Sequence, residues 1–108
     1  MDTEKCIIVE GRSDKLKIAP LFAEDVAIVC TNGTVDEEVL IDIIEPFEQC
    51  DLFTLFDADK SGDRLRKTMK RCYSEATQLT IPKQYLEVAK TPADILTEIL
   101  RKAKFMMK

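Results

Sequence analysis

The sequence contains no histidine, and this absence excludes several kinds of active site. Without histidine there is no serine-histidine or cysteine-histidine couple for nucleophilic catalysis, and no histidine-ligated zinc. Any catalytic proton or bound metal must therefore be handled mainly by carboxylates, lysines, thiols or water.

Paired cysteines and long apolar runs are missing as well. The four cysteines are widely spaced, so no C-x-x-C motif is present to bind zinc or to cycle between thiol and disulfide. No stretch approaches the roughly 18 apolar residues of a membrane-spanning helix, and the first five residues lack the apolar region of a signal peptide. We therefore expect a cytoplasmic protein whose cysteines are small buried residues. These cysteines are Cys6, Cys30, Cys50 and Cys72.

Glycine and proline are scarce too, with three and four in 108 residues, whereas 45% of the residues are hydrophobic and 33% are charged. This composition argues against a disordered chain and is typical of a globular one. The length suits one domain with one core, so we expect residues 1–108 to form a single domain.

Apolar runs and helical periodicities alternate along the chain. Continuous apolar runs at residues 6–9, 26–30 and 52–56 are typical of strands buried on both faces of a parallel sheet, and a weaker run at 77–81 predicts a fourth strand. Apolar spacing predicts helices over residues 13–22, 39–47, 65–73 and 92–103. Pro20 should distort or end the first helix, and Thr91 should cap the last. We therefore predict a three-layer α/β/α fold with a mostly parallel sheet of about four strands covered by helices on both faces.

The three glycines mark the carboxyl ends of the three strong strands. Gly11 follows the first strand, Gly33 lies in Thr31-Asn32-Gly33-Thr34 after the second, and Gly62 closes Asp57-Ala58-Asp59-Lys60-Ser61-Gly62 after the third. Ligands of open α/β sheets bind beyond these strand ends, where glycine permits positive φ and lets backbone amides approach a phosphate. We therefore expect the binding site at this edge of the sheet.

Glu10, Asp57 and Asp59 should converge at the same edge. Asp57 and Asp59 are two residues apart, so in an extended backbone both carboxylates point to the same side, and Glu10 arrives from another strand end. Three such carboxylates repel one another unless a cation is bound or a proton is retained. Oxygen ligands favour a hard ion, of which Mg²⁺ is the best candidate. The alternative interpretation of an isolated D-x-D motif is a turn or a helix cap.

Positive charge is confined to particular segments. No lysine or arginine lies between Lys17 and Lys60, but a basic cluster follows at once and a second one lies near the end of the sequence. Each cluster is either a solvated helix face or a strip that binds a polyanion. The clusters consist of Lys60, Arg64, Arg66, Lys67, Lys70 and Arg71, and of Arg101, Lys102, Lys104 and Lys108.

Together these segments resemble a Toprim domain, the fold shared by topoisomerases, bacterial primases, recombination proteins and some nucleases. The resemblance rests on Val9-Glu10-Gly11-Arg12-Ser13-Asp14, on Thr31-Asn32-Gly33-Thr34, and on Phe56-Asp57-Ala58-Asp59-Lys60-Ser61-Gly62 followed by Arg64 and Arg66. Within the family, the sequence is most similar to the Toprim unit of the ribonuclease that matures small ribosomal RNA.

The resemblance implies a role for each matching residue. Glu10 matches a glutamate that acts as general acid or base, Asp57 and Asp59 match aspartates that hold Mg²⁺, and Asp14 matches a recurring acid; Mn²⁺ is expected to substitute for Mg²⁺. All three members of the Glu10, Asp57 and Asp59 set are candidate metal ligands. The implied chemistry is nucleotidyl transfer or phosphodiester hydrolysis on RNA or DNA. The candidate contacts to phosphate or nucleic acid are Gly11, Asn32, Gly33, Lys60, Gly62, Arg64 and Arg66.

Three functions remain open at this stage. The first is a metal-dependent nuclease or nucleotidyl transferase whose basic residues, Lys67 among them, contact phosphate. The second is a module that binds metal and nucleic acid but needs a partner protein for activity. The third is an aspartate-phosphorylating hydrolase with Asp57 as nucleophile, although that motif normally opens the chain and Glu10 would then have no role.

Two features of some family members have weak counterparts in this sequence. Family topoisomerases use a tyrosine nucleophile from another domain, whereas neither Tyr73 nor Tyr85 stands in a recognisable motif. Many members carry a further acid after the fourth strand. Asp94 lies near that place, but as an early helix residue it is also explained as a partner of the helix dipole.

Overall fold

The computed structural model of the protein describes residues 4–34 and 36–108. The expectation about a signal peptide falls partly on residues 1–3, which lie outside the described residues. Strands and helices alternate along the described part, as the sequence predicts. The strands are β1 (Lys5–Val9), β2 (Ala27–Cys30), β3 (Asp51–Leu55) and β4 (Thr77–Leu79), and the helices are α1 (Arg12–Ile18), α2 (Glu37–Ile44), α3 (Lys60–Cys72) and α4 (Ala93–Lys102).

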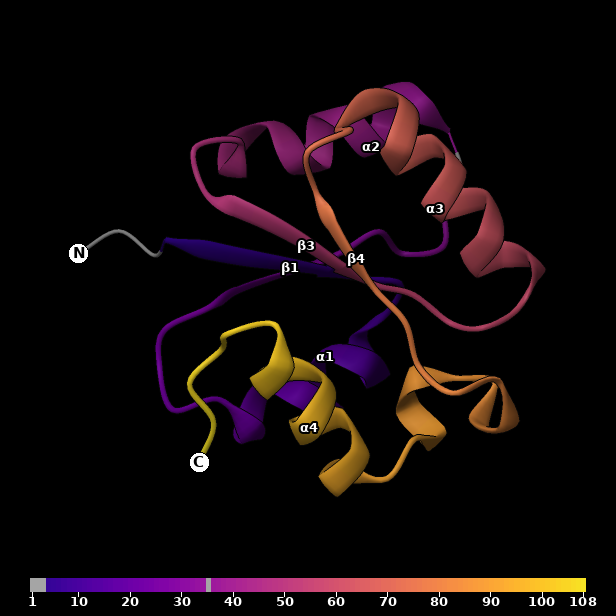
Figure 1. The fold of residues 1–108 in the computed structure, drawn as a ribbon. Helices are drawn as coiled ribbons and strands as arrows, with labels where there is room; N and C mark the ends of the chain where they lie inside the picture. Colours follow the sequence, from indigo (N-terminus) through magenta and orange to yellow (C-terminus); the bar gives the residue numbers. More distant parts are fainter. Residues whose placement is uncertain (1–3, 35) are drawn as a thin grey trace.

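The four strands form one parallel sheet in the order β2-β1-β3-β4. Figure 1 shows α2 and α3 on one face of this sheet and α1 and α4 on the other. The predicted three-layer α/β fold is therefore confirmed. Because β1 and β3 are adjacent and parallel, the segments that follow them leave the sheet side by side.

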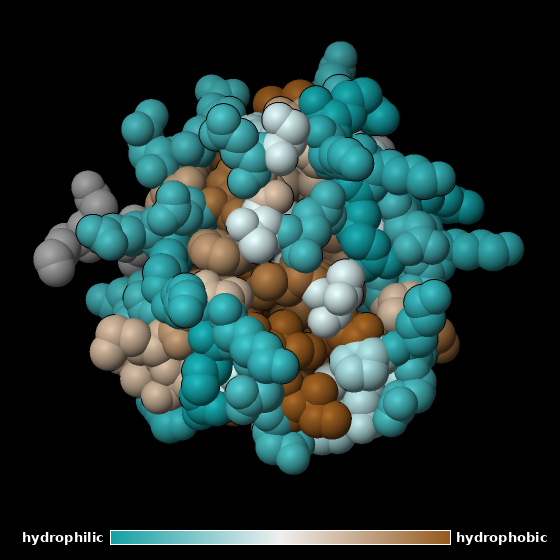
Figure 2. Space-filling view, in the orientation of Figure 1, coloured by the Kyte–Doolittle hydropathy of each residue, from teal (hydrophilic) through white to brown (hydrophobic). Residues whose placement is uncertain are grey.

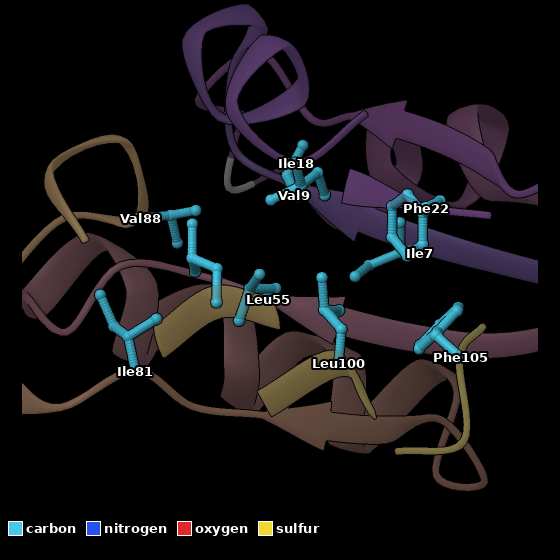
Figure 3. Close-up of a cluster of buried hydrophobic side chains, with 10 residues drawn as sticks. Ile7, Val9, Ile18, Phe22, Leu55, Ile81, Val88, Leu100 and Phe105 are labelled. Carbon is cyan, nitrogen blue, oxygen red and sulfur yellow. The ribbon is translucent and has the colours of Figure 1, made fainter. Parts of the chain in front are cut away.

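Strand β1 explains why its sequence is apolar at every position. Ile7 and Val9 face the cluster under α1 and α4, which Figure 3 shows, whereas Cys6 and Ile8 face the cluster under α2 and α3. All four side chains are completely buried. A strand with an aqueous face would alternate between apolar and polar residues, so the continuous run is the signature of the covered sheet.

Prolines end the first two helices. Helix α1 stops at Ile18 and continues as a 3-10 turn, Ala19–Leu21, which contains Pro20, as expected from the missing amide of proline. Helix α2 stops at Ile44 before a second such turn, Glu45–Phe47. Its start lies two residues before the predicted one, because the Asp36 carboxylate caps the amides of the first turn.

The predicted cap of α4 is wrong. Thr91 is completely buried, and its hydroxyl donates to the Glu87 carbonyl at 2.9 Å, while Pro92 occupies the position before the first helical residue. A buried hydroxyl needs an acceptor, and for Thr91 this is the Glu87 carbonyl, directly before the 3-10 turn Val88–Lys90. The hydroxyl is therefore engaged with the preceding turn and not with the first turn of α4.

The cysteines differ in burial. Cys6 lies in the core, and burial raises the pKa of its thiol to about 12. Cys30 and Cys72 are only partly buried, and the Cys72 thiol donates to the Glu37 carboxylate at 3.0 Å. The expectation of small buried residues therefore holds fully for Cys6 alone among these three. None of the helices in residues 4–34 and 36–108 is long and apolar enough to cross a membrane.

Candidate metal centre

Glu10, Asp57 and Asp59 meet at the carboxyl edge of the sheet. Each offers one carboxylate oxygen, and these oxygens lie within 4.8 Å of one another. Glu10 directly follows β1, and both aspartates follow the neighbouring strand β3. The structure thus brings together the three acids that the sequence places at strand ends.

Glu10 is tied to the segment that follows β3. Its Oε2 accepts the backbone N–H of Asp57 at 2.7 Å, and its Oε1 accepts the Ser61 hydroxyl at 3.3 Å. Burial raises the pKa of Glu10, and the negative charges of Asp57 and Asp59 raise it further, although the two hydrogen bonds act in the opposite direction. The carboxyl group is therefore held in place and keeps its proton to a higher pH than an ordinary glutamate.

Asp57 is held by the segment after β4. Its Oδ1 accepts the backbone N–H of Val88 at 2.8 Å. Burial raises the pKa of Asp57, and the charges of Asp59 and Glu87 add to the rise against the opposing effect of this bond. Burial is thus the first cause of the shift, and the neighbouring negative charges are the second.

Asp59 fits both interpretations of the D-x-D motif. It is the N-cap of α3, where its Oδ1 accepts the backbone N–H of Gly62 at 2.8 Å, and it also belongs to the acidic cluster. A cap uses one oxygen of a carboxylate and leaves the second available. The two roles are therefore compatible.

Close approach explains the glycine at position 62. A Cβ atom on Gly62 would overlap the backbone carbonyl of Asp57, so a larger residue would displace the segment that carries both aspartates. Gly33 and Asn32 instead have positive φ, 79° and 58°, and form the turn after β2. The N–H of Asn32 donates to the Glu10 carbonyl at 2.8 Å, which places this turn beside the cluster.

Gly11 differs from the expectation of a positive φ at a strand end. Its φ is −145°, which is extended backbone, and it serves as the residue before α1. Its N–H donates to the Asp14 carboxylate at 3.1 Å. Asp14 is only 5% exposed, and burial together with the charge of Asp57 raises its pKa. The acid that the motif places after Gly11 thus fixes the turn next to Glu10 and lies within electrostatic range of the cluster.

The four basic residues of α3 that were expected to contact phosphate fall into two groups. Lys60, Arg64 and Lys67 are exposed, are spaced so that they share one helix face, and make no ion pair within the described part of the chain. Figure 2, in the orientation of Figure 1, shows hydrophilic side chains over this helix. Arg66 is different, because its guanidinium pairs with Asp63 at 2.6 Å and approaches the Phe56 carbonyl at 3.5 Å. Arg66 is thus engaged within the fold, unlike its three neighbours.

The acid after β4 that lies near the cluster is Glu87, which the sequence did not single out. The Glu87 charge raises the pKa of both Asp57 and Asp14. Asp94 is instead exposed in the first turn of α4, where its Oδ1 accepts the Ile95 amide at 3.0 Å, so its helix-end interpretation holds. The sequence does contain acids after the fourth strand, but no pattern in it distinguishes Glu87 as the one near the cluster.

Neither tyrosine belongs to the acidic cluster, and a pocket of the structure lies away from it. Tyr73 follows the last residue of α3, at the opposite end of this helix from Asp59, and burial raises its pKa to about 12. Tyr85 directly precedes Leu86 in the segment after β4. A pocket of about 570 Å³ is lined by residues around the starts of β3 and β4 and contains no member of the acidic cluster. This pocket therefore lies at the end of the sheet opposite to the acidic cluster.

No family model matches the sequence. An uncharacterized protein of Bacillus subtilis (strain 168), YusF, is 40% identical over 102 residues, which cover 94% of this chain and 70% of that protein. The solved structure of a small TOPRIM domain protein from Bacillus stearothermophilus is 42% identical and matches with a TM-score of 0.94 over 100% of this chain and 92% of that one.

Proposed function

The chain belongs to the Toprim domain family, and from this premise we propose that it is a metal-dependent phosphodiester enzyme, a nuclease or a nucleotidyl transferase, acting on RNA or DNA. Toprim domains bind divalent metal and typically take part in nucleic-acid chemistry, and this chain carries the acidic cluster. The observation that carries the proposal is the set of three carboxylate oxygens within 4.8 Å of one another. Such a set of hard oxygen donors fits Mg²⁺, with Mn²⁺ as a substitute.

The two aspartates suit the role of metal ligands. Each uses Oδ1 for a backbone amide, Asp57 for that of Val88 and Asp59 for that of Gly62. These bonds hold the carboxylates close together despite their repulsion, and a cation between them would remove that repulsion. A bound divalent ion supplies charge neutralisation at the phosphate and activation of a water molecule.

Glu10 suits the transfer of a proton as well as ligation. Both of its oxygens accept hydrogen bonds, and its raised pKa lies nearer to neutral pH than that of an ordinary glutamate. A general acid or base works best when its pKa approaches the operating pH. We assign to Glu10 the proton transfer at the attacking or leaving oxygen of the phosphodiester.

We place the phosphate backbone of the substrate across the start of α3. Lys60, Arg64 and Lys67 are exposed on one face of the helix that begins at Asp59, so they form a positive strip leading away from the metal centre. The turn at Asn32 and Gly33 follows β2, on the other side of β1 from this strip, and its Asn32 N–H is already used by the Glu10 carbonyl. Phosphates bound along this line would be neutralised by the strip.

The test is cleavage or ligation of single-stranded and duplex RNA and DNA oligonucleotides by the purified chain. We expect turnover with Mg²⁺ or Mn²⁺ and none with a chelator. Asp57→Asn and Glu10→Gln should each lower turnover by a factor of about 10² or more, as expected for loss of a ligand or of the acid-base group. Asp94→Asn, which neutralises an exposed acid outside the cluster, is the matched control. Unchanged turnover in both cluster variants would refute the assignment.

A second candidate function is a metal-dependent nucleic-acid-binding module that relies on a partner protein for activity. Lys60, Arg64 and Lys67, which are exposed and make no ion pair within residues 4–34 and 36–108, favour it, because they serve binding whether or not the chain is catalytic. Its signature is binding that requires Mg²⁺ and weakens steeply with salt, with no turnover by the chain alone.

A further inference from the structure

Leu86 has a backbone conformation that a leucine rarely adopts. Its φ and ψ are 64° and −48°, and the N–H of Glu87 donates to the Tyr85 carbonyl at 2.6 Å across it. This is a γ-turn of the rare hand, which is strained for any residue with a Cβ atom and is more easily adopted by glycine. A large apolar residue at its centre therefore needs an explanation.

Leu86 is only partly buried by the fold. The residue is 51% exposed, although its side chain is large and apolar. The turn is fixed by backbone contacts that any residue could make. The Leu86 carbonyl accepts the Ala58 N–H at 2.7 Å, and the N–H of Val88, two residues later, donates to the Asp57 carboxylate. The shape of the turn thus depends on docking to the Asp57-Ala58-Asp59 segment, and the leucine side chain is not required for it.

The same contacts place Leu86 at the metal centre. Ala58, whose amide it binds, lies between the two aspartates, and Figure 1 shows the segment after β4 beside the start of α3 at one end of the sheet. Lys83, in the same segment, lies within electrostatic range of Asp63 on α3. An exposed apolar side chain next to a metal centre that would hold a phosphate matches a nucleotide, whose base is apolar on its faces.

We propose that Leu86 packs against the base adjoining the phosphate held at the metal centre, and that the substrate therefore presents an unstacked base there. This inference rests on the proposed function and narrows it. In a regular duplex both faces of each base are covered by its neighbours, so the contact requires a single strand, a strand end or a base turned out of the helix. Contact with a bound base then explains why a strained and exposed leucine lies beside the reaction centre.

The experiment combines a protein change with a ligand change. Affinity for a single-stranded RNA or DNA 9-mer is measured by fluorescence anisotropy in Mg²⁺, with phosphorothioate linkages to prevent cleavage, and with one abasic residue moved along the strand. Glycine adopts this φ and ψ without strain, and asparagine is strained there no more than leucine, so neither Leu86→Gly nor Leu86→Asn should lower the free energy of unfolding appreciably. Both should bind the intact 9-mer about five- to tenfold more weakly, the factor expected for burying the exposed half of a leucine side chain.

The abasic scan identifies the contact. In the wild type, one abasic position should weaken binding by a similar factor, and in Leu86→Asn the same position should have no effect, as for two groups that interact directly. The control is Met106→Asn, another exposed apolar residue, which lies beside Glu24 and Lys5 at the start of β1 and should behave as the wild type.

The possible results separate this inference from the proposed function. Wild-type binding that is unchanged in Leu86→Asn, or an abasic penalty of equal size in both proteins, overturns the inference, leaves the proposed function standing and points to a protein as the partner of Leu86. Absence of any metal-dependent binding by the wild type refutes the proposed function and the inference with it.

Discussion

Replacing Glu10 by glutamine should stabilise the metal-free protein while it abolishes metal binding. Glutamine has the shape of glutamate and keeps an oxygen for the Asp57 N–H, while its NH₂ group faces the Ser61 hydroxyl, which can turn to accept from it. The change therefore removes the charge and keeps both contacts. The Glu10 oxygen lies within 4.8 Å of both aspartate oxygens. Two unit charges at that distance repel by about 0.9 kcal/mol in water and about 3.5 kcal/mol at an effective dielectric constant of 20.

The expected gain lies near the lower of these limits, because the three acids are only partly buried and water screens them. Removing two repulsive pairs then raises the free energy of unfolding by about 2 kcal/mol, which corresponds to an increase in Tm on the order of 8 °C for a domain of this size. The assay is thermal and urea unfolding in the presence of a chelator. Glu75→Gln, an exposed glutamate in the loop after α3, is the matched control and should change Tm by less than about 2 °C.

The pH dependence identifies the cause. The folded-state pKa of Glu10 is raised above its ordinary value of 4.5, so the folded chain binds the proton more tightly than the unfolded chain does. The destabilisation by Glu10 is therefore absent below pH 4.5, grows as the pH rises through that value, and is complete above the raised pKa. The gain in unfolding free energy of Glu10→Gln should depend on pH in the same way. A gain that is equal at pH 4 and pH 8, or no gain at all, would refute the argument from repulsion.

Added Mg²⁺ should raise the Tm of the wild type above that of Glu10→Gln. It should raise the Tm of the wild type in proportion to the logarithm of its concentration above Kd and should not change that of Glu10→Gln.

Three further predictions concern the surroundings of the cluster. Asp59→Asn should keep the α3 cap and the stability but weaken metal binding, whereas Asp59→Ala should also cost about 1 kcal/mol in unfolding free energy; both follow from urea titrations with and without Mn²⁺. Gly62→Ala should lower stability by about 2 kcal/mol and weaken metal binding, because the new Cβ would displace the Asp57 carbonyl; wild-type stability would contradict the close approach. Lys67→Ala should reduce the slope of log affinity against log salt for an oligonucleotide by about 1, and an unchanged slope would remove Lys67 from the phosphate contacts.

The architecture was predictable because burial on two faces leaves a simple pattern. The continuous apolar run of β1 divides into Ile7 and Val9 on one side and Cys6 and Ile8 on the other, so no polar residue interrupts it. The parallel order of strands then fixes which ends meet. The convergence of Glu10 with Asp57 and Asp59 followed from strand ends alone, with no knowledge of the helices.

The rest of the site was not predictable from local patterns. The segment after β4 has no periodicity, and Leu86 is not a residue that signals a turn, because the strain at this position is imposed by a contact with Ala58 that is 28 positions distant in sequence. The role of Thr91 depended on burial, which a capping rule does not include. The engagement of Arg66 with Asp63 was readable in principle as a pair three residues apart on a helix.

The hydrogen bonds at the cluster determine which energetic changes contribute to the free energy of metal binding. Each of the three acids accepts a backbone N–H from a different part of the chain: Glu10 from Asp57, Asp57 from Val88 and Asp59 from Gly62. Because main-chain donors hold the carboxylates, they are already close to one another before a cation binds, and the fold bears the cost of their repulsion. A cation therefore gains the relief of that repulsion without having to order a loop. Metal affinity should consequently follow the number of charges in the cluster more closely than the identity of the side chains around it.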